Sequence, residues 1–478
     1  MESWDVVVVG GGPAALRAAI ASADAGSSPV MIDSYGTGAA SGAAPTAGLA
    51  VSIEETDSSV HLEDTIAAGG ESVNEKAASR ICSQAVSTLA ELEKWGLILR
   101  RTDAGLPHAS ETPGHTRPRM TGCGDSTLRE VTRILEEQAI KRSISRRTDI
   151  IPISLVMDNQ QVRGIVAFDL MAGKVVSIQA KAVILATEGH QGIWSNTSQG
   201  SGSGAALAAQ AGVDLAGMAH TPKHALSISG IDLKLPFDLL GSGGRLRKED
   251  GEDVGPEAVI DGEQCVLDLR FLDSEAAVWF AQTSRRVKDR AGIDISMDVI
   301  PLSSSVADTT GGAPVDEHGR VTFDEGSMWF TGLYAAGRSA HTGMHGSGLL
   351  PGNILLEDLV GGRSAGEHAG GWATQASFSS SSTIKAATKT AEVLIDDLAS
   401  GSGNSVSRVS NSLTSIMSAV NGNRDENSLA KAAEDLSNLR GSGISLTDIS
   451  RVMNTELATA LRLQGMMALA EAIVSTED

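Results

Sequence analysis

The chain has 478 residues, of which 41% are hydrophobic and 20% are charged, and it carries a formal net charge of −21 at pH 7. This length exceeds what one compact core supports, so two or three domains are expected. The acidic balance argues against a nucleic-acid partner, because phosphate binding needs clustered Lys and Arg, and it disfavours direct docking on anionic lipid. We interpret the acidic surface as an adaptation for solubility or salt.

The cysteines and histidines predict no metal site. Cys82, Cys123 and Cys265 are far apart and form no CxxC pair, so neither a disulfide framework nor an iron–sulfur cluster within this chain is expected. His220 and His224 would share one face of a helix, but no further metal ligands accompany them.

The start of the chain and its hydropathy bear on where the protein acts. A strand is expected to begin near Trp4, which leaves no room for a signal or transit peptide, and no apolar run approaches the length that spans a bilayer. We therefore expect a cytoplasmic protein, with any attachment to the inner face of the cell membrane made through partner subunits.

The first predicted elements form a βαβ unit. Residues 5–9 (DVVVV) are typical of a buried parallel strand, since a continuous β-branched run suits a sheet that is covered on both faces. An Ala-rich helix is expected over residues 16–25, and a second strand over residues 29–32. The turn between the first strand and the helix, residues 10–15 (GGGPAA), indicates a dinucleotide site.

Individual residues of this unit have distinct expected roles. Gly10 permits the tight turn, and Gly12 lets the backbone approach a pyrophosphate, which the N-terminus of the helix holds. Ala15 is small enough for close packing of the helix on the strand. Asp33, which follows the second strand, can accept hydrogen bonds from a ribose. This pattern alone does not separate NAD from FAD.

Later segments decide between the two cofactors. In chain order they are residues 39–50 (AASGAAPTAGLA), 61–70 (HLEDTIAAGG), 89–96, 116–130 (TRPRMTGCGDSTLRE), 180–189 (AKAVILATEG), 201–204, 311–312 with 315–320 (VDEHGR), 332–337 (GLYAAG), 345–355 (HGSGLLPGNIL) and 454–473. Together they resemble, in the same order, motifs of the flavoprotein subunits of succinate dehydrogenase and fumarate reductase. L-aspartate oxidase is a near relative in that family. The resemblance covers nearly the whole chain.

The resemblance implies an α/β fold with three parts. A doubly wound, Rossmann-like FAD-binding domain would be assembled from residues 1–215 and 318–375. An α+β capping domain, residues 216–317, would be inserted between them. A helical C-terminal domain would follow over residues 376–478.

FAD is the cofactor that the resemblance implies. The family binds FAD covalently through a histidine, but Ser41 stands at the aligned position, so we expect noncovalent FAD. Arg338 replaces a family acid, and Glu188 replaces a family glycine. The residues expected to bind FAD are Gly10, Gly12, Ala15, Asp33, Ser41, Gly48, Asp125, Ala186, Thr187, Gly337, Asn353 and Leu355.

The groups that would bind and protonate a dicarboxylate are largely replaced. The family uses two arginines, two histidines and a Thr–Glu pair for this purpose. At the aligned positions this chain has Leu240 and Leu349 for the arginines, Ala307 for one histidine, and Pro236 and Phe237 for the Thr–Glu pair. Leucine offers a carboxylate no paired hydrogen bonds. We expect an apolar pocket that binds succinate poorly.

Three residues remain as candidates for catalysis. His224 and His345 keep their family positions, so either could donate a hydrogen bond to a substrate or to the flavin. Arg245, with Arg247 beside it, follows a glycine pair and could fold back toward the flavin. If both arginines face solvent, dicarboxylate chemistry becomes hard to defend.

Three functions stay open. The first is an FAD-dependent oxidoreductase of the succinate dehydrogenase and fumarate reductase type, which passes electrons to an iron–sulfur protein. The second is a related oxidase or dehydrogenase for a more apolar small-molecule substrate. The third is a catalytically degenerate flavoprotein that serves as a structural subunit.

Overall fold

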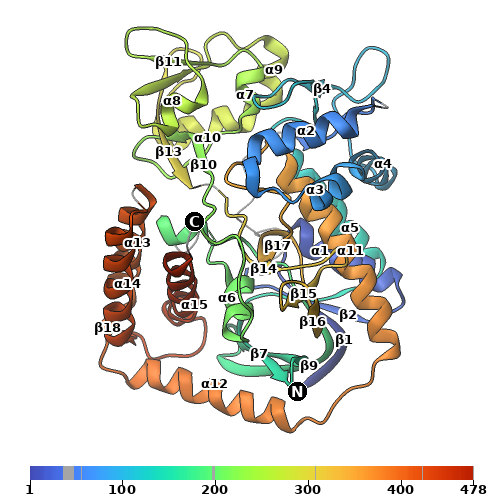
Figure 1. Ribbon diagram of the computed structural model, residues 1–478, viewed down its shortest axis with the longest axis vertical. Coiled ribbons are helices and arrows are strands. Elements are labelled where there is room, and N and C mark those ends of the chain that lie inside the picture. Colours follow the sequence, from blue (N-terminus) through green and yellow to red (C-terminus); the bar gives the residue numbers. More distant parts are fainter. Residues whose placement is uncertain (36–47, 55, 196–199, 307, 423, 477–478) are drawn as a thin grey trace.

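The central sheet is the frame of the molecule (Figure 1). The computed structural model describes residues 1–35, 48–54, 56–195, 200–306, 308–422 and 424–476. Within these, the parallel core of the sheet has the strand order β16–β9–β1–β2–β6, and β7, β8 and β15 extend it by antiparallel pairing. The strands are β1 (Glu2–Val9), β2 (Pro29–Ile32), β6 (Ser145–Arg147), β7 (Ile150–Asp158), β8 (Gln161–Asp169), β9 (Lys174–Leu185), β15 (Arg320–Phe323) and β16 (Met328–Ala335).

The parallel strands end at one edge of the sheet. Val9 of β1 is in register with both Ile32 of β2 and Leu185 of β9, and Ala335 of β16 is in register with Leu185. In doubly wound sheets, ligands bind outside the carboxyl ends of the strands. The expected α/β fold class is confirmed, and this edge is where a cofactor site belongs. The domain boundaries inferred from the resemblance stay predictions.

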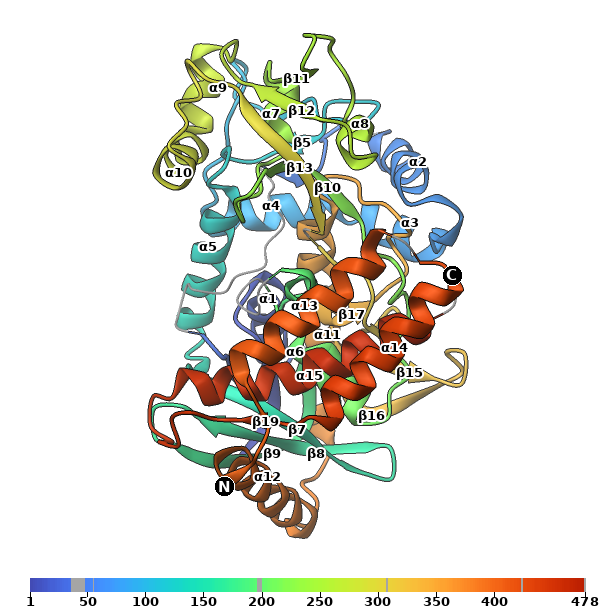
Figure 2. The same cartoon turned by 90° about the vertical axis from the view of Figure 1, so that its left-hand side faces the viewer.

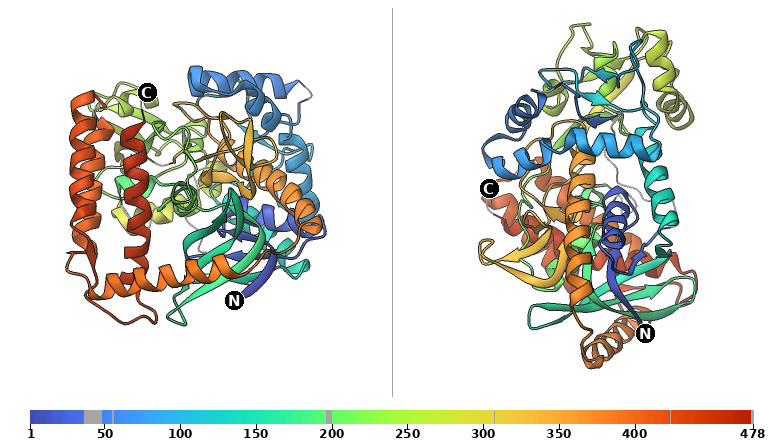
Figure 3. Two further views of the ribbon diagram at one scale, coloured as in Figure 1. Left: turned by 60° about the horizontal axis from the view of Figure 1, so that its bottom comes forward. Right: turned by 90° about the vertical axis from the view of Figure 1, so that its right-hand side faces the viewer.

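Two helices that are far apart in the sequence cover one face of the sheet together. Helix α1 (Pro13–Asp24) packs along α11 (Asn353–Gln375), the long helix beside it in the right-hand panel of Figure 3. A Cβ at Gly362 or Gly366 of α11 would overlap a backbone carbonyl oxygen of α1. Small residues at four-residue spacing therefore let the two backbones approach closely. Helix α5 (Thr127–Lys141) also packs on α1.

The long connection between β2 and α5 builds a layer beside α11. Its described residues include three α-helices and a small antiparallel sheet of order β3–β5–β4. The elements are α2 (Asp57–Gly69), α3 (Glu75–Cys82), α4 (Ala85–Trp95), β3 (Leu49–Ala50), β4 (Ala109–Ser110) and β5 (Met120–Thr121). Helices α3 and α4 pack on α11.

The capping region lies at the top of Figure 1 and has its own hydrophobic core. Its antiparallel sheet has the order β10–β13–β12–β11, with short helices around it. The elements are β10 (Lys223–Ile228), α7 (Asp238–Gly241), β11 (Arg245–Lys248), α8 (Pro256–Ile260), β12 (Cys265–Asp268), α9 (Ser274–Trp279), α10 (Ala281–Ala291) and β13 (Ile300–Val306). Strands β14 (Ala313–Pro314) and β17 (Ala340–His341) pair between this region and the central sheet's last strands.

Helices dominate the C-terminal part. Helix α12 (Ser382–Ser400) lies along β7, β8 and β9, and three further helices stand as a group beside the sheet, as Figures 2 and 3 show. These are α13 (Val406–Gly422), α14 (Glu426–Gly441) and α15 (Thr455–Ser475), with β18 (Asn404–Ser405) and β19 (Ile444–Ser445) pairing below them. Helix α15 packs on α6 (Ser203–Gln210).

One described helix, α15, is long and apolar enough to cross a membrane by length and composition alone. No apolar run of that length was expected from the sequence. However, 61% of its most apolar window is buried inside the protein, with Leu463, Leu469 and Ile473 among its core residues. Packing in the C-terminal core accounts for its apolar character.

Candidate functional site

The glycine turn at the carboxyl end of β1 is shaped for close backbone approach. Gly10 has φ of 131°, and a Cβ there would overlap the carbonyl oxygen of Ala186. A Cβ at Gly12, by contrast, would meet no atom of the described chain within 4 Å. Gly12 is also the N-cap of α1, and no side chain in the described residues caps that helix end. Free N–H groups at a helix N-terminus beside open space suit a pyrophosphate.

Asp33 fits the ribose of the same cofactor. Its side chain is buried, and Oδ1 accepts a hydrogen bond from Tyr35 N at 3.3 Å. Within the described residues, Oδ2 has no hydrogen-bond partner. Burial raises the pKa of this carboxyl to about 6, although Arg146, with Nη2 3.8 Å from Oδ2, opposes that rise. A ribose hydroxyl would give the orphaned oxygen a donor, so the residues present fit FAD.

Other residues expected at the cofactor lie at the same edge of the sheet. Ala186 and Thr187 follow β9, and Thr187 N donates to Ser339 Oγ at 2.9 Å. Gly337 begins the turn after β16, and a Cβ there would come 2.7 Å from the Cβ of Ala14. Ala15 is fully buried in α1. Ser41 lies outside the described residues.

The remaining predicted cofactor residues have different surroundings. Asp125 accepts a hydrogen bond from Thr283 N of α10 at 2.6 Å, so the structure joins it to the capping region. Leu355 is buried in the first turn of α11. Gly48 precedes β3, and a Cβ there would crowd the side chain of Met120.

Asn353, at the start of α11, is held by a polar network that the sequence reading did not identify. Its Oδ1 accepts a hydrogen bond from His61 Nε2 at 2.6 Å, and its Nδ2 donates to Thr65 Oγ1 at 2.9 Å. Burial lowers the pKa of His61 to about 4. A neutral His61 with its proton on Nε2 is what this hydrogen bond requires.

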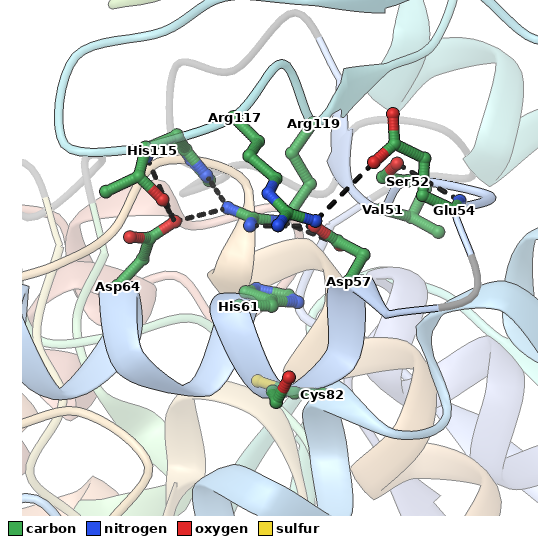
Figure 4. Close-up of polar contacts among 12 residues, drawn as sticks. Val51, Ser52, Glu54, Asp57, His61, Asp64, Cys82, His115, Arg117 and Arg119 are labelled. Atoms are coloured by element: carbon green, nitrogen blue, oxygen red, sulfur yellow. Dashed lines mark hydrogen bonds and ion pairs between the residues drawn. The ribbon is translucent and has the colours of Figure 1, made fainter.

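Arg119 is the centre of the adjoining network (Figure 4). Its guanidinium is fully buried and makes two hydrogen bonds of 2.9 Å to Asp57 and one of 2.8 Å to Asp64. The same group donates to His115 Nδ1 at 2.6 Å, and His115 Nε2 donates to the carbonyl oxygen of Pro351 at 2.9 Å. The network therefore fixes the turn at residues 351–353 that begins α11.

A cavity of about 540 Å³ lies where that turn meets the capping region. Capping residues and the loop before α11 share its wall. The lining residues are Ala68, Pro113, Gly114, Thr221, Pro222, Lys223, His224, Phe237, Pro256, Glu257, Ile260, Asp308, Ser347, Gly348, Leu349, Leu350, Pro351, Gly352 and Ile354. Among these described residues there is no arginine.

The cavity contains part of the pocket expected from the sequence. Phe237 and Leu349 line it, whereas Leu240 packs against the capping core and Ala307 lies outside the described residues. His224 also lines the cavity, but its Nε2 bonds to Leu235 O at 2.7 Å and burial lowers its pKa to about 4. Because a carbonyl only accepts, the proton of this neutral ring is on Nε2.

Arg245 is not brought to the cavity. Its side chain is 53% exposed, lies 3.8 Å from Asp253, and stacks on the ring of Phe271. Arg247, on the same strand, pairs with Asp253 and with Asp268 of β12. Both arginines therefore bind acids of the capping region itself, which counts against dicarboxylate chemistry.

His345 belongs to a buried charged cluster at the edge of the cavity. Its Nε2 lies 3.2 Å from Glu357 Oε2, and Thr342 and Arg338 also donate to Glu357. Arg338 lies 3.6 Å from Asp358 as well. Although burial opposes it, Arg338 holds the pKa of Glu357 well below its usual range.

Asp308 was missed by the sequence reading. It follows β13, lines the cavity and is 3% exposed, and within the described residues its Oδ1 has no hydrogen-bond partner. Burial raises the pKa of this carboxyl to about 7. The available signal was a lone acid directly after the position of a family substrate histidine, among threonines and glycines.

Comparisons with known proteins agree with this geometry. Residues 5–355 match the family described as "FAD binding domain", and residues 410–476 match "Fumarate reductase flavoprotein C-term". A similar relative is a fumarate reductase flavoprotein subunit from Mycobacterium tuberculosis, 28% identical, with 99% of this chain and 89% of the relative covered.

Two solved structures show how the fold is shared. Escherichia coli quinol fumarate reductase FrdA, in a mutant form, has a TM-score of 0.89 and 23% identity, covering 99% of this chain and 89% of that chain. A 3-ketosteroid dehydrogenase from Rhodococcus jostii, in complex with 4-androstene-3,17-dione, has a TM-score of 0.55 and 18% identity, covering 77% of this chain and 97% of that one. With the glycine turn, Asp33 and the match over residues 5–355, the chain belongs to the FAD-binding domain family and is an FAD-dependent oxidoreductase.

Proposed function

We propose that this chain is the flavoprotein component of a multisubunit oxidoreductase of the succinate dehydrogenase and fumarate reductase type. When bound, FAD supplies hydride transfer to or from a substrate carbon, and a separate iron–sulfur protein takes up or delivers the electrons. The observation that carries the proposal is the cofactor cradle at the sheet edge with a substrate-sized cavity under the capping region. Attachment to a membrane would come through partners.

In this proposal the chain's own residues hold the reactants. Gly12 and the N-terminus of α1 bind the pyrophosphate, and Asp33 binds the ribose. The Arg119 network positions the turn at residues 351–353, which forms one wall of the cavity. Phe237, together with the leucines of that loop, excludes water from the substrate.

A specific observation favours a substrate more apolar than succinate. Leu349 and Phe237 line the cavity, and no arginine stands among the described lining residues. A dicarboxylate would therefore leave its charges without bidentate partners. The R. jostii steroid complex has a related fold with an apolar ligand, which supports this reading.

The test is spectroscopic. The purified chain loaded with FAD should show a bound-flavin spectrum, and anaerobic succinate should not bleach it, nor should fumarate reoxidise the reduced form. Tagged protein from its own source should elute with iron in proportion to flavin. Rapid bleaching by succinate would contradict the proposal that the substrate is more apolar than succinate. Failure to retain FAD, or elution as an iron-free homodimer, would contradict the proposed function.

A further inference from the structure

The charges beside the cavity are out of balance. Three carboxyl groups, those of Asp308, Glu357 and Asp358, face one buried guanidinium, that of Arg338. Glu357 takes the strongest contact with Arg338, and Asp358 is the second carboxyl within reach. Nothing in the described chain donates to Asp308 Oδ1.

The titration of these groups reflects the shortage of positive charge. Burial raises the pKa of Asp308 to about 7 and that of Asp358 to about 6. Arg338 opposes the rise in both cases, and Lys234 also opposes it at Asp308, but these cations do not cancel it. A buried carboxylate is stable when a cation or several donors face it. Asp308, which lines the cavity, has room on that side for such a partner.

The rest of the cavity wall is suited to an apolar body. The volume of about 540 Å³ admits a small organic molecule. Five side chains contribute hydrocarbon surface to the wall: Phe237, Ile260, Leu349, Leu350 and Ile354. Lys223 and Glu257 also line the cavity, but both are exposed to solvent, where a charge interacts weakly. Asp308 is thus the buried charged group that a ligand meets among the described lining residues.

We propose that the cavity takes a substrate with a cationic amine on an apolar body, and that the Asp308 carboxylate is its counter-ion. This assignment rests on the proposed function and names the substrate class of the same site. The expected ligand is therefore a cation, whereas succinate is an anion. An ammonium group would pair with the acidic cluster, but a carboxylate would add a fourth negative group to it.

The experiment compares four probes on the full chain loaded with FAD. They are n-hexylamine, n-hexanoate and n-hexanol, which share one apolar body, and succinate. Calorimetry and the perturbation of the flavin spectrum report binding without turnover. We expect n-hexylamine to bind at least tenfold more tightly than the other three. Its binding should also release protons near pH 7, because pairing with the ammonium ionises Asp308.

Variants assign the effect to one residue. Asp308→Asn should abolish the tenfold preference for n-hexylamine, and Asp308→Glu should retain part of it. Asp253→Asn, the same change at an exposed acid of the capping region, is the matched control and should keep the full preference.

The inference is overturned if n-hexanoate, n-hexanol or succinate binds as tightly as the amine, or if none of the probes binds. It is also overturned if the preference survives in Asp308→Asn or is lost in Glu257→Gln instead. Flavin retention, measured on the same samples, separates these failures from failure of the proposed function.

Discussion

The cofactor half and the substrate half of this site differ in what builds them. At the cofactor half, the shape comes from backbone: Gly10 against Ala186, the open approach at Gly12, and the helix N-terminus behind it. At the substrate half, the shape comes from side chains on the cavity wall, such as Leu349 and Asp308.

The two halves should therefore differ in how freely their residues can be substituted. A backbone cradle tolerates few changes, because a Cβ in the wrong place overlaps a carbonyl. A cavity wall tolerates substitution, because the fold does not depend on which side chain fills the space. The same FAD-binding frame can thus serve a substrate of different charge. The predictions below test this contrast.

The largest effect is expected at Arg119, whose network holds the turn at residues 351–353 beside the cavity. Arg119→Ala leaves Asp57 and Asp64 as buried carboxylates without their cation, and it should cost about 3 to 5 kcal/mol of unfolding free energy. Urea unfolding measures this. The matched control is Arg117→Ala, an exposed arginine two residues away that should change stability by less than about 0.5 kcal/mol. Equal effects of the two changes would contradict a positioning role for Arg119.

The buried carboxyl of Asp33 should destabilise the FAD-free protein at neutral pH. Its pKa is about 6 in the folded chain and about 3.9 in an unfolded one, so the folded state binds more protons between pH 4 and 6. Stability therefore falls as pH rises through this window, and the full cost, up to about 3 kcal/mol, applies above pH 6. Asp33→Asn should stabilise the FAD-free protein at pH 7 but not at pH 3.5, while weakening FAD binding. A gain of the same size at both pH values would rule out titration of Asp33 as the cause.

Gly12→Ala should weaken FAD binding without changing the stability of the FAD-free protein. Gly12→Ala adds a Cβ that meets no atom of the described chain, so the FAD-free protein should unfold at an unchanged urea concentration. The new methyl group enters the space assigned to the pyrophosphate, and FAD affinity should fall roughly tenfold or more, or about 1.4 kcal/mol. As a control, Gly361→Ala, also in open space but on α11, should keep FAD affinity and add up to about 1 kcal/mol of helix stability. Unchanged FAD binding in Gly12→Ala would show that the pyrophosphate does not bind at this turn.

The smallest effect is expected at Arg245. Its pairing with Asp253 is exposed to solvent, so Arg245→Ala should change stability by less than about 0.5 kcal/mol. It should also leave ligand-induced changes in the flavin spectrum as they are, because the side chain lies on the capping surface. A marked loss of ligand response would restore Arg245 as a candidate for catalysis.

The sequence was informative where local pattern and backbone geometry coincide. The strand over residues 5–9, the glycine turn and Asp33 are contiguous, so their relation follows from the periodicity of one βαβ unit. Phe237 and Leu349 could be assigned to one pocket through the family resemblance. The fold class followed from the order of motifs along the chain.

The parts that escaped prediction depend on contacts between distant segments. Asp57 and Asp64 meet Arg119 because α2 packs across the connection before β5, which no local pattern encodes. The pKa of Asp308 is raised because the side chain is buried, and its charged neighbour Arg338 lies 30 residues later in the chain. Arg245 was misleading for the opposite reason, since its partner Asp253 is close in sequence but belongs to a hairpin on the outer surface.

The close packing of α1 on α11 has a consequence for how the protein is made. Ser22 of α1 donates a hydrogen bond to Gly366 of α11, a residue 344 positions later. The side of α1 that packs on α11, with Ala14, Ala18 and Ala21, therefore lacks its native cover until synthesis has passed residue 375. Contacts at such separation delay folding and leave hydrophobic surface available for misassembly. The dinucleotide unit therefore leaves the ribosome before α11, and its packing is completed only after α11 has followed. Proteolysis of ribosome-bound chains should show residues 1–35 fully protected only after α11 has emerged, with partial protection once α5 and β9 are made.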